Sequence, residues 1–156
     1  MTVTEPPNKT ATAKALILSD NEAQRASFVR LVGNVRNCTP VPFEKVEDAL
    51  MWAIATQPEL IVLIDMRPAH MGLEFLRRAQ SAPELIAIPK MFICANDSEA
   101  RRRAISFGAT DCGGTSDASE TVERIQNLLA LSRVRSQLAI EVKDARQRVQ
   151  ASDSRS

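Results

Sequence analysis

The sequence has 156 residues, of which 44% are hydrophobic and 25% are charged, a composition typical of a globular protein. A formal net charge of +1 argues against nucleic acid as a partner, and the longest apolar runs are too short to cross a membrane. No signal-peptide pattern opens the chain, so we expect a cytoplasmic location. Three scattered cysteines favour reduced thiols over a disulfide framework or a zinc site.

Strand and helix patterns alternate five times along the chain. Short continuous apolar runs predict the strands, whereas capping residues and glycines mark the helix ends. The predicted strands cover residues 15–18, 38–42, 60–64, 91–94 and the region around 111–112. The predicted helices follow residues 19–21, cover 46–55 and 73–80, and open at the capping boxes 96–99 and 117–120.

Continuous rather than alternating apolar strands indicate a parallel sheet with helices on both faces. Five such units in about 120 residues fit an α/β, flavodoxin-like, five-stranded parallel sheet. We expect this domain to span residues 13–131. A polar, proline-bearing segment predicts a disordered tail over residues 1–12, and a helical extension is expected over residues 132–156.

Two of the predicted strands run directly into aspartates, Asp20 and Asp65. Function gathers at the carboxyl ends of strands in open parallel sheets, and these two strands are neighbours in the predicted fold, so we expect the two carboxylates to converge. Close carboxylates repel unless a cation joins them, and oxygen ligands suit Mg²⁺. The alternative is that both are ordinary loop or helix-start residues, but the spacing favours a site.

Four motifs, in order, resemble the receiver domain of bacterial two-component response regulators, with a chemotaxis-regulator-like fold. They read ALILSDNEAQR, ELIVLIDMRPAHMG, MFICAND and FGATDCGGTS, and the resemblance covers about three quarters of the chain. It implies that Asp65 accepts a phosphoryl group from a histidine kinase or phosphotransfer protein. It also implies Mg²⁺ bound by Asp20, Asp65 and the backbone carbonyl of Arg67, and a signalling module rather than an enzyme, with at most self-phosphorylation from a phosphodonor.

The sequence departs from that family within the expected site. Ser19 replaces one acid of the pair that includes Asp20, Cys94 stands at the switch serine or threonine, and Thr115 stands where the family has a lysine. A thiol is a weaker hydrogen-bond donor than a hydroxyl, and the lysine would supply a fixed positive charge to the phosphoryl group. The loop over residues 65–72 is also one residue shorter than usual.

Other residues near the expected site carry weaker signals. Ser116 stands at the position of a cis-proline, and Cys112 at that of an aromatic switch. Arg67 could replace the lost cation, although a solvated loop arginine is the simpler interpretation. We expect His70 to be exposed and structural. Cys94 and Cys112 could form a redox pair on adjacent strands, but we favour buried, inert thiols.

The last helical pattern continues beyond what the domain needs. Its heptad-spaced apolar residues are Leu131, Leu138, Val142, Ala145 and Val149, with Arg135 interrupting the seam. This spacing predicts a coiled-coil linker or a homodimer seam, and the alternative is a solvated helix that frays. The segment also resembles the linker between receivers and domains that make or hydrolyse cyclic-di-GMP, which implies such an output domain or partner. The chain is then either a fragment or a single-domain protein.

Two functional hypotheses remain open. A phosphorylatable receiver that signals through its C-terminal helix is favoured by the retained Asp20 and Asp65. A pseudo-receiver, which uses the same fold as a phosphorylation-independent interaction or dimerisation module, is favoured by Cys94, Thr115 and Ser116. A small enzyme or flavin binder is disfavoured because no Gly-rich or Ser/Thr-rich phosphate loop follows the first strand.

Overall fold

The computed structural model describes residues 12–66, 69–95, 97–114 and 118–153. Strands and helices alternate along most of the chain. They are β1 (Ala13–Leu18), α1 (Glu22–Gly33), β2 (Cys38–Phe43), α2 (Val46–Thr56), β3 (Leu60–Asp65), α3 (Met71–Ala79), α4 (Pro83–Ile86), β4 (Lys90–Cys94), α5 (Ser98–Ser106), β5 (Asp111–Gly113) and α6 (Ala118–Asp153).

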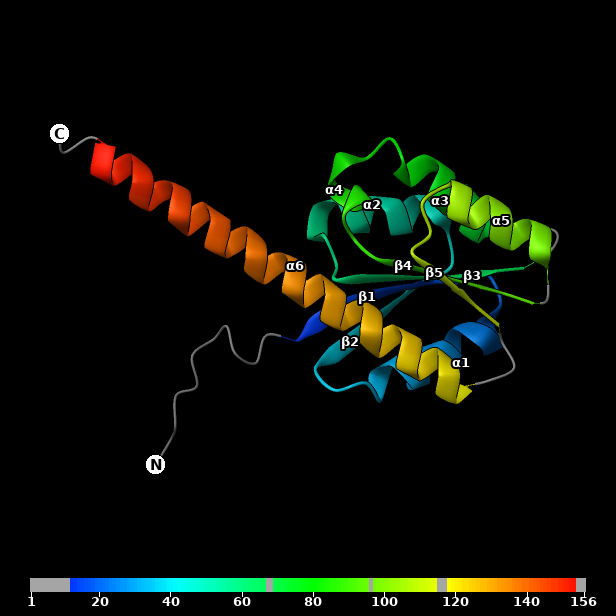
Figure 1. Ribbon diagram of the computed structural model, residues 1–156. Helices are drawn as coiled ribbons and strands as arrows, with labels where there is room; N and C mark the ends of the chain where they lie inside the picture. The colour runs from blue at the N-terminus through cyan, green and yellow to red at the C-terminus, as the bar shows by residue number, and fades with distance from the viewer. Residues whose placement is uncertain (1–11, 67–68, 96, 115–117, 154–156) are drawn as a thin grey trace, which may run out of the picture.

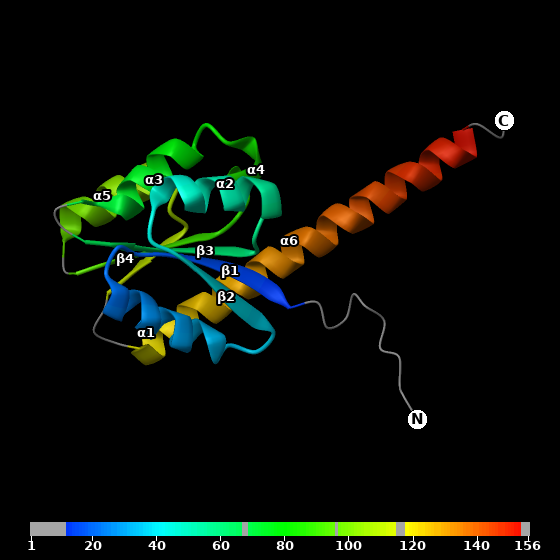
Figure 2. The ribbon, with the colours of Figure 1, turned by 180° about the vertical axis from the view of Figure 1, so that it is seen from behind.

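The five strands form one parallel sheet in the order β2-β1-β3-β4-β5, which confirms the predicted α/β architecture. Helices α2, α3, α4 and α5 cover one face, and α1 and the first part of α6 cover the other (Figure 1). Figure 2 shows from behind that the remainder of α6 projects away from the sheet. The extended C-terminal helix is therefore confirmed as well.

The sheet is buried on both faces because successive strand side chains point to opposite sides. Leu16 and Phe92 belong to the hydrophobic cluster beneath α2, α3 and α5, whereas Ile17 and Ile93 belong to the one beneath α1 and α6. All six residues of β3 are buried. This double covering explains why the strands read as continuous apolar runs rather than as alternating patterns.

Some element boundaries differ from the sequence prediction. Helix α3 begins at Met71 rather than after Gly72. The short helix α4 was not predicted; it opens with Pro83, whose fixed φ suits the first helical turn, and it is held by the fully buried Leu85. Two prolines in β2 are tolerated because this strand lies at the edge of the sheet.

Helix α6 has two different environments. Ile125, Leu128 and Leu129 are buried against the sheet, whereas every described side chain from 133 to 152 is exposed. The boundary at residue 131 between domain and extension stays a prediction. The predicted tail lies outside the described residues except for Thr12. None of the described helices is long and apolar enough to span a membrane.

Lys90 is a buried charge at the start of β4. The residue is only 5% exposed, and its ammonium group donates hydrogen bonds to the carbonyl oxygens of Leu85 and, at 2.9 Å, Ile88. Burial lowers its pKa from 10.5 to about 8. The side chain thus joins α4 to the sheet while carrying a desolvation penalty in its protonated form.

We predict that Lys90 makes the free energy of unfolding rise between about pH 8 and 10.5, because in this window the unfolded chain binds more protons than the folded chain. The rise is at most about 3 kcal/mol. Urea unfolding of wild type and Lys90→Met across this range measures it. Burial raises the pKa of Cys38 to about 11, which makes the free energy of unfolding fall as the pH rises, but by the same amount in both proteins. The same pH dependence in both proteins would contradict the prediction.

Candidate functional site

The candidate site is built around Asp65, the last residue of β3. The residue is only 5% exposed and lies at the carboxyl end of the central strand. Strand pairing places Cys94, the last residue of β4, directly beside it. The sequence predicted both positions from the apolar runs that precede them.

Both carboxylate oxygens of Asp65 have hydrogen-bond partners within the chain. Oδ1 accepts a hydrogen bond from the backbone N–H of Leu73 at 3.2 Å, and Oδ2 lies 2.6 Å from Nδ1 of His70. When the Asp65 carboxylate is ionised it only accepts hydrogen bonds, and Nδ1 is then the donor in this pair. The expectation that His70 is exposed was wrong, since its side chain is about one-third exposed and covers a buried carboxylate.

The backbone holds the His70 ring in this position. His70 adopts the left-handed conformation, with φ of 48° and ψ of 48°, at the N-cap of α3. Its N–H donates to the carbonyl of Met66 at 2.9 Å, and its own carbonyl accepts from the N–H of Glu74 at 3.1 Å. Few non-glycine residues adopt positive φ, so the segment is constrained at the residue that contacts Asp65.

Gly72 allows α3 to approach Asp65. A Cβ atom built on Gly72 would lie 3.0 Å from Cε2 of Phe92 and 3.2 Å from both Cβ and Oδ1 of Asp65. Phe92 is fully buried and Asp65 nearly so, which leaves both little room to move. Gly72 is therefore a point of close packing inside α3 rather than the end of the loop.

The serine that follows β1 has a structural role. Ser19 is fully buried, and its hydroxyl accepts a hydrogen bond from the N–H of Asn21 at 3.1 Å. Arg25 donates to the Ser19 carbonyl at 2.9 Å, and Asn21 caps α1 by accepting from the N–H of Gln24. Asp20 lies on the exposed side of this turn. The sequence thus predicted the helix start correctly, and Asp20 is accessible to solvent and to a partner.

The two cysteines near the site are poorly suited to redox chemistry. Cys94 is 2% exposed, and its thiol lies 3.9 Å from the carbonyl oxygen of Asp97. Burial, reinforced by Cys94 and Asp111, raises the pKa of the Cys112 thiol. A raised thiol pKa disfavours the reactive thiolate. Cys94 is buried as predicted, whereas Cys112 is only partly buried, and the inertness of the two thiols stays a prediction.

The predicted metal ligands are only partly described. Arg67, Thr115 and Ser116 lie outside the described residues, so their predicted roles stay predictions. Within the described ranges, no group of three or more acidic, histidine or cysteine side chains could hold a metal ion. Because both oxygens of Asp65 already have partners, the donor set in this conformation does not fit a Mg²⁺ site.

Comparison with solved structures identifies the fold. The chemotaxis response regulator CheY4 of Vibrio cholerae is 18% identical, with a TM-score of 0.66 over 75% of this chain and 98% of its own. A LuxR-family two-component response regulator from Aurantimonas is 22% identical, with a TM-score of 0.67 over 76% of this chain and 86% of its own. The signal receiver domain of a histidine kinase from Syntrophus aciditrophicus is 19% identical, with a TM-score of 0.67 over 76% and 91%.

These likenesses establish that the chain has the receiver fold. No protein-family model matches the sequence, and no curated protein sequence matches it either. The likeness shown is therefore one of backbone fold.

We predict that Gly72→Ala destabilises the protein by about 1–3 kcal/mol, because the added methyl group collides with Phe92 and Asp65 and outweighs the gain in helix propensity of about 1 kcal/mol. Gly33→Ala is the matched control. Gly33 also lies in a helix, but its added Cβ would meet only Pro40 Cγ, at 3.8 Å, so this variant should be neutral or slightly stabilising. Urea unfolding compares the two, and equal effects would show that the site tolerates the methyl group.

Proposed function

We propose that the protein is a signal receiver module of a two-component pathway, in which Asp65 accepts a phosphoryl group and the C-terminal helix transmits the signal. The observation that carries this proposal is the place of Asp65 in a receiver fold: a carboxylate at the carboxyl end of the central strand, beside the end of β4. The buried strand holds the carboxylate in one position, and positioning is the main requirement of phosphoryl transfer.

In the proposed reaction, an Asp65 carboxylate oxygen attacks the phosphorus of a phosphodonor. The new O–P bond forms as the bond to the donor breaks, and the donor takes that electron pair. A histidine kinase or a phosphotransfer protein would supply the phosphoryl group, and no other enzymatic activity is proposed. Asp20, Asp65 and the Arg67 carbonyl stay the predicted ligands of Mg²⁺, which would neutralise charge on the phosphoryl group, but no step of the proposed reaction is assigned to it because the described residues do not fit the ion.

The pseudo-receiver is the second candidate, and two observations favour it. Cys94 contributes a buried thiol that faces the Asp97 carbonyl instead of a hydroxyl directed at the site. The His70 ring also engages Oδ2 of Asp65 in a hydrogen bond, so this oxygen is already in use within the chain. A chain of this kind would use the receiver fold for protein contacts without phosphorylation.

We predict that acetyl phosphate with Mg²⁺ adds one phosphoryl group to the wild type, detected by intact mass, and none to Asp65→Asn. The asparagine cannot form the acyl phosphate, although it preserves the shape of the side chain. Asp48→Asn is the matched control, because Asp48 is an exposed aspartate on α2 and its loss should leave modification unchanged. Equal modification of Asp65→Asn would remove the acceptor assignment, and an unmodified wild type would favour the pseudo-receiver.

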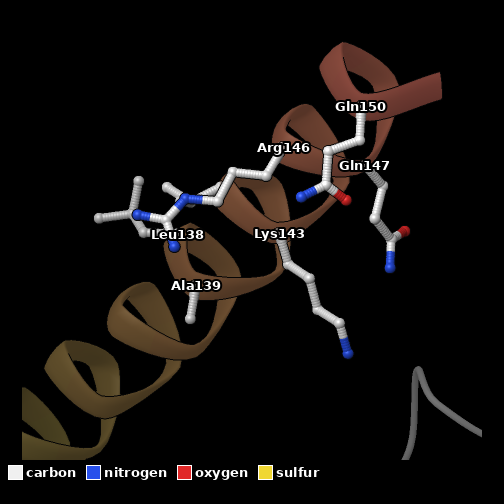
Figure 3. Close-up of a pocket in the computed structure, with 7 residues that line it drawn as sticks. Leu138, Ala139, Lys143, Arg146, Gln147 and Gln150 are labelled. Atoms are coloured by element: carbon white, nitrogen blue, oxygen red, sulfur yellow. The ribbon is translucent and has the colours of Figure 1, made fainter. Parts of the chain in front are cut away.

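We also propose that the extension of α6 pairs with the same helix of a second copy. Leu138, Val142 and Val149 are 54%, 49% and 61% exposed, although all three are apolar. Figure 3 shows Leu138 and Arg146 among the side chains that project from this helix beyond the domain. A solitary helical extension is marginal in water, and a partner helix would remove the apolar stripe from solvent.

The heptad pattern favours a parallel pair. Leu138 and Ala145 take one core position of the heptad, and Val142 and Val149 take the other; valine at a with leucine at d is typical of parallel dimers. In this register Glu141 of one copy faces Arg146 of the partner subunit, an attractive pair of opposite charges. Arg135, the polar residue at a core position, donates to the carbonyl of Ala87 at 3.2 Å, so the seam would begin beyond it.

We predict that the full chain dimerises at micromolar concentration and that a chain ending at Leu131 is monomeric. Val142→Lys should weaken the dimer by roughly tenfold or more, because it places two like charges in the seam. Ile140→Lys is the matched control: Ile140 is 55% exposed, close to the 49% of Val142, but lies on the opposite side of the helix. Light scattering measures all four proteins. A monomeric wild type, or equal effects of the two substitutions, would contradict the proposed seam.

A further inference from the structure

The contact between His70 and Asp65 has a consequence for phosphoryl transfer. We propose that His70 is an internal latch on Asp65: its ring holds the Oδ2 atom of the carboxylate, so that a phosphodonor reaches this oxygen only after the ring has moved away. This inference rests on the proposed acceptor function of Asp65 and adds a regulatory residue to that site. The 2.6 Å separation of Nδ1 and Oδ2 is its central observation.

The latch is built into the backbone rather than made by a freely rotating surface side chain. The N–H of His70 closes a turn onto Met66, and its carbonyl begins the hydrogen bonding of α3. These bonds hold the left-handed residue at the point where its ring reaches Asp65. Oδ1 accepts the hydrogen bond from the Leu73 N–H, and even a Cβ atom on Gly72 would lie within 3.2 Å of it, so we take Oδ2 as the oxygen that a reactant would use.

Among the described residues, the hydrogen bonds to Asp65 come from the His70 ring and the Leu73 backbone. The Asp65 side chain is 1% exposed, whereas that of His70 is about one-third exposed. The side chain that contacts the buried carboxylate is therefore itself partly open to solvent, and in the proposed latch a phosphodonor has to displace its ring to reach Oδ2.

The latch would slow the formation of the O–P bond. The attacking electron pair belongs to an oxygen that already accepts a short hydrogen bond, and the ring occupies space that the phosphoryl group needs. A hydrogen bond to a charged group contributes enough that its loss should raise the transfer rate by about tenfold or more. The resting protein would thus be a slow acceptor, and a partner that turns the His70 ring away from Asp65 would release it.

Two substitutions at His70 separate the hydrogen bond from the backbone conformation. Glycine adopts positive φ without strain, so His70→Gly removes the ring and keeps the turn. Asparagine also tolerates this conformation, and its amide nitrogen is attached at the same position along the side chain as Nδ1 of histidine. His70→Asn therefore keeps a donor for Asp65.

The initial rate of modification by acetyl phosphate, measured by intact mass, tests the latch. We expect His70→Gly to react about tenfold faster than the wild type or more, and His70→Asn to react at close to the wild-type rate. A His70→Gly rate at or below the wild-type rate would overturn the latch and leave the acceptor function intact. Equal acceleration in both variants would overturn the role of the donated hydrogen bond.

A second measurement tests the contact without any phosphodonor. His70 is the only histidine in the chain, so its ring nitrogens give a single set of NMR signals. We expect the Nδ1 signal to shift between wild type and Asp65→Ala. An unchanged signal would overturn the latch whatever the phosphorylation result. If the signal shifts but no variant is modified at Asp65, the acceptor function is overturned and the contact is structural only.

Discussion

A buried carboxylate must have hydrogen-bond donors, and the segment after β3 folds around this requirement. Asp65 ends a strand with no exposed residue, and water cannot fully solvate its charge there. The start of α3 supplies one donor from its backbone, and the preceding turn supplies another from the His70 ring. The left-handed residue and the close approach of Gly72 both follow from bringing these donors to one carboxylate.

Much of the fold could be predicted because its signals are local. The continuous apolar runs predicted the buried strands, and Asn21 caps α1 within the predicted segment 19–21. The capping box 96–99 also predicted a helix start, but the side chain that caps α5 is that of Asp97, one residue further along. Helix α4 escaped prediction because four residues are too few for a helical period to show. In the site, the ends of the predicted strands gave the correct positions of Asp65 and Cys94. The contact of His70 could not be foreseen, because no repeating pattern in the sequence indicates where a side chain in an irregular turn will point.

The polar replacements around Asp65 have a common character. Where the receiver family has a second acid, Ser19 is buried and bonded to its own turn. Where the family has a hydroxyl, Cys94 is buried and faces the Asp97 carbonyl. Each of these groups is satisfied locally and offers little to a phosphoryl group. Around the buried carboxylate of Asp65, these two polar side chains therefore belong to the packing of the domain.

Helix α6 runs along the sheet from the carboxyl ends of the strands to their amino ends. It starts after β5, at the carboxyl ends of the strands, where Asp65 also lies, and near their amino ends Arg133 contacts the Asn37 carbonyl and Glu59. Beyond Leu131 the helix extends for about 33 Å. If the helix tilts about the contacts of Arg133, this extension acts as a lever arm. A tilt of roughly 10° at the pivot would carry the far end through about 6 Å. A change too small to disturb the packing of the domain would thus become a displacement on the scale of a side chain at the tip.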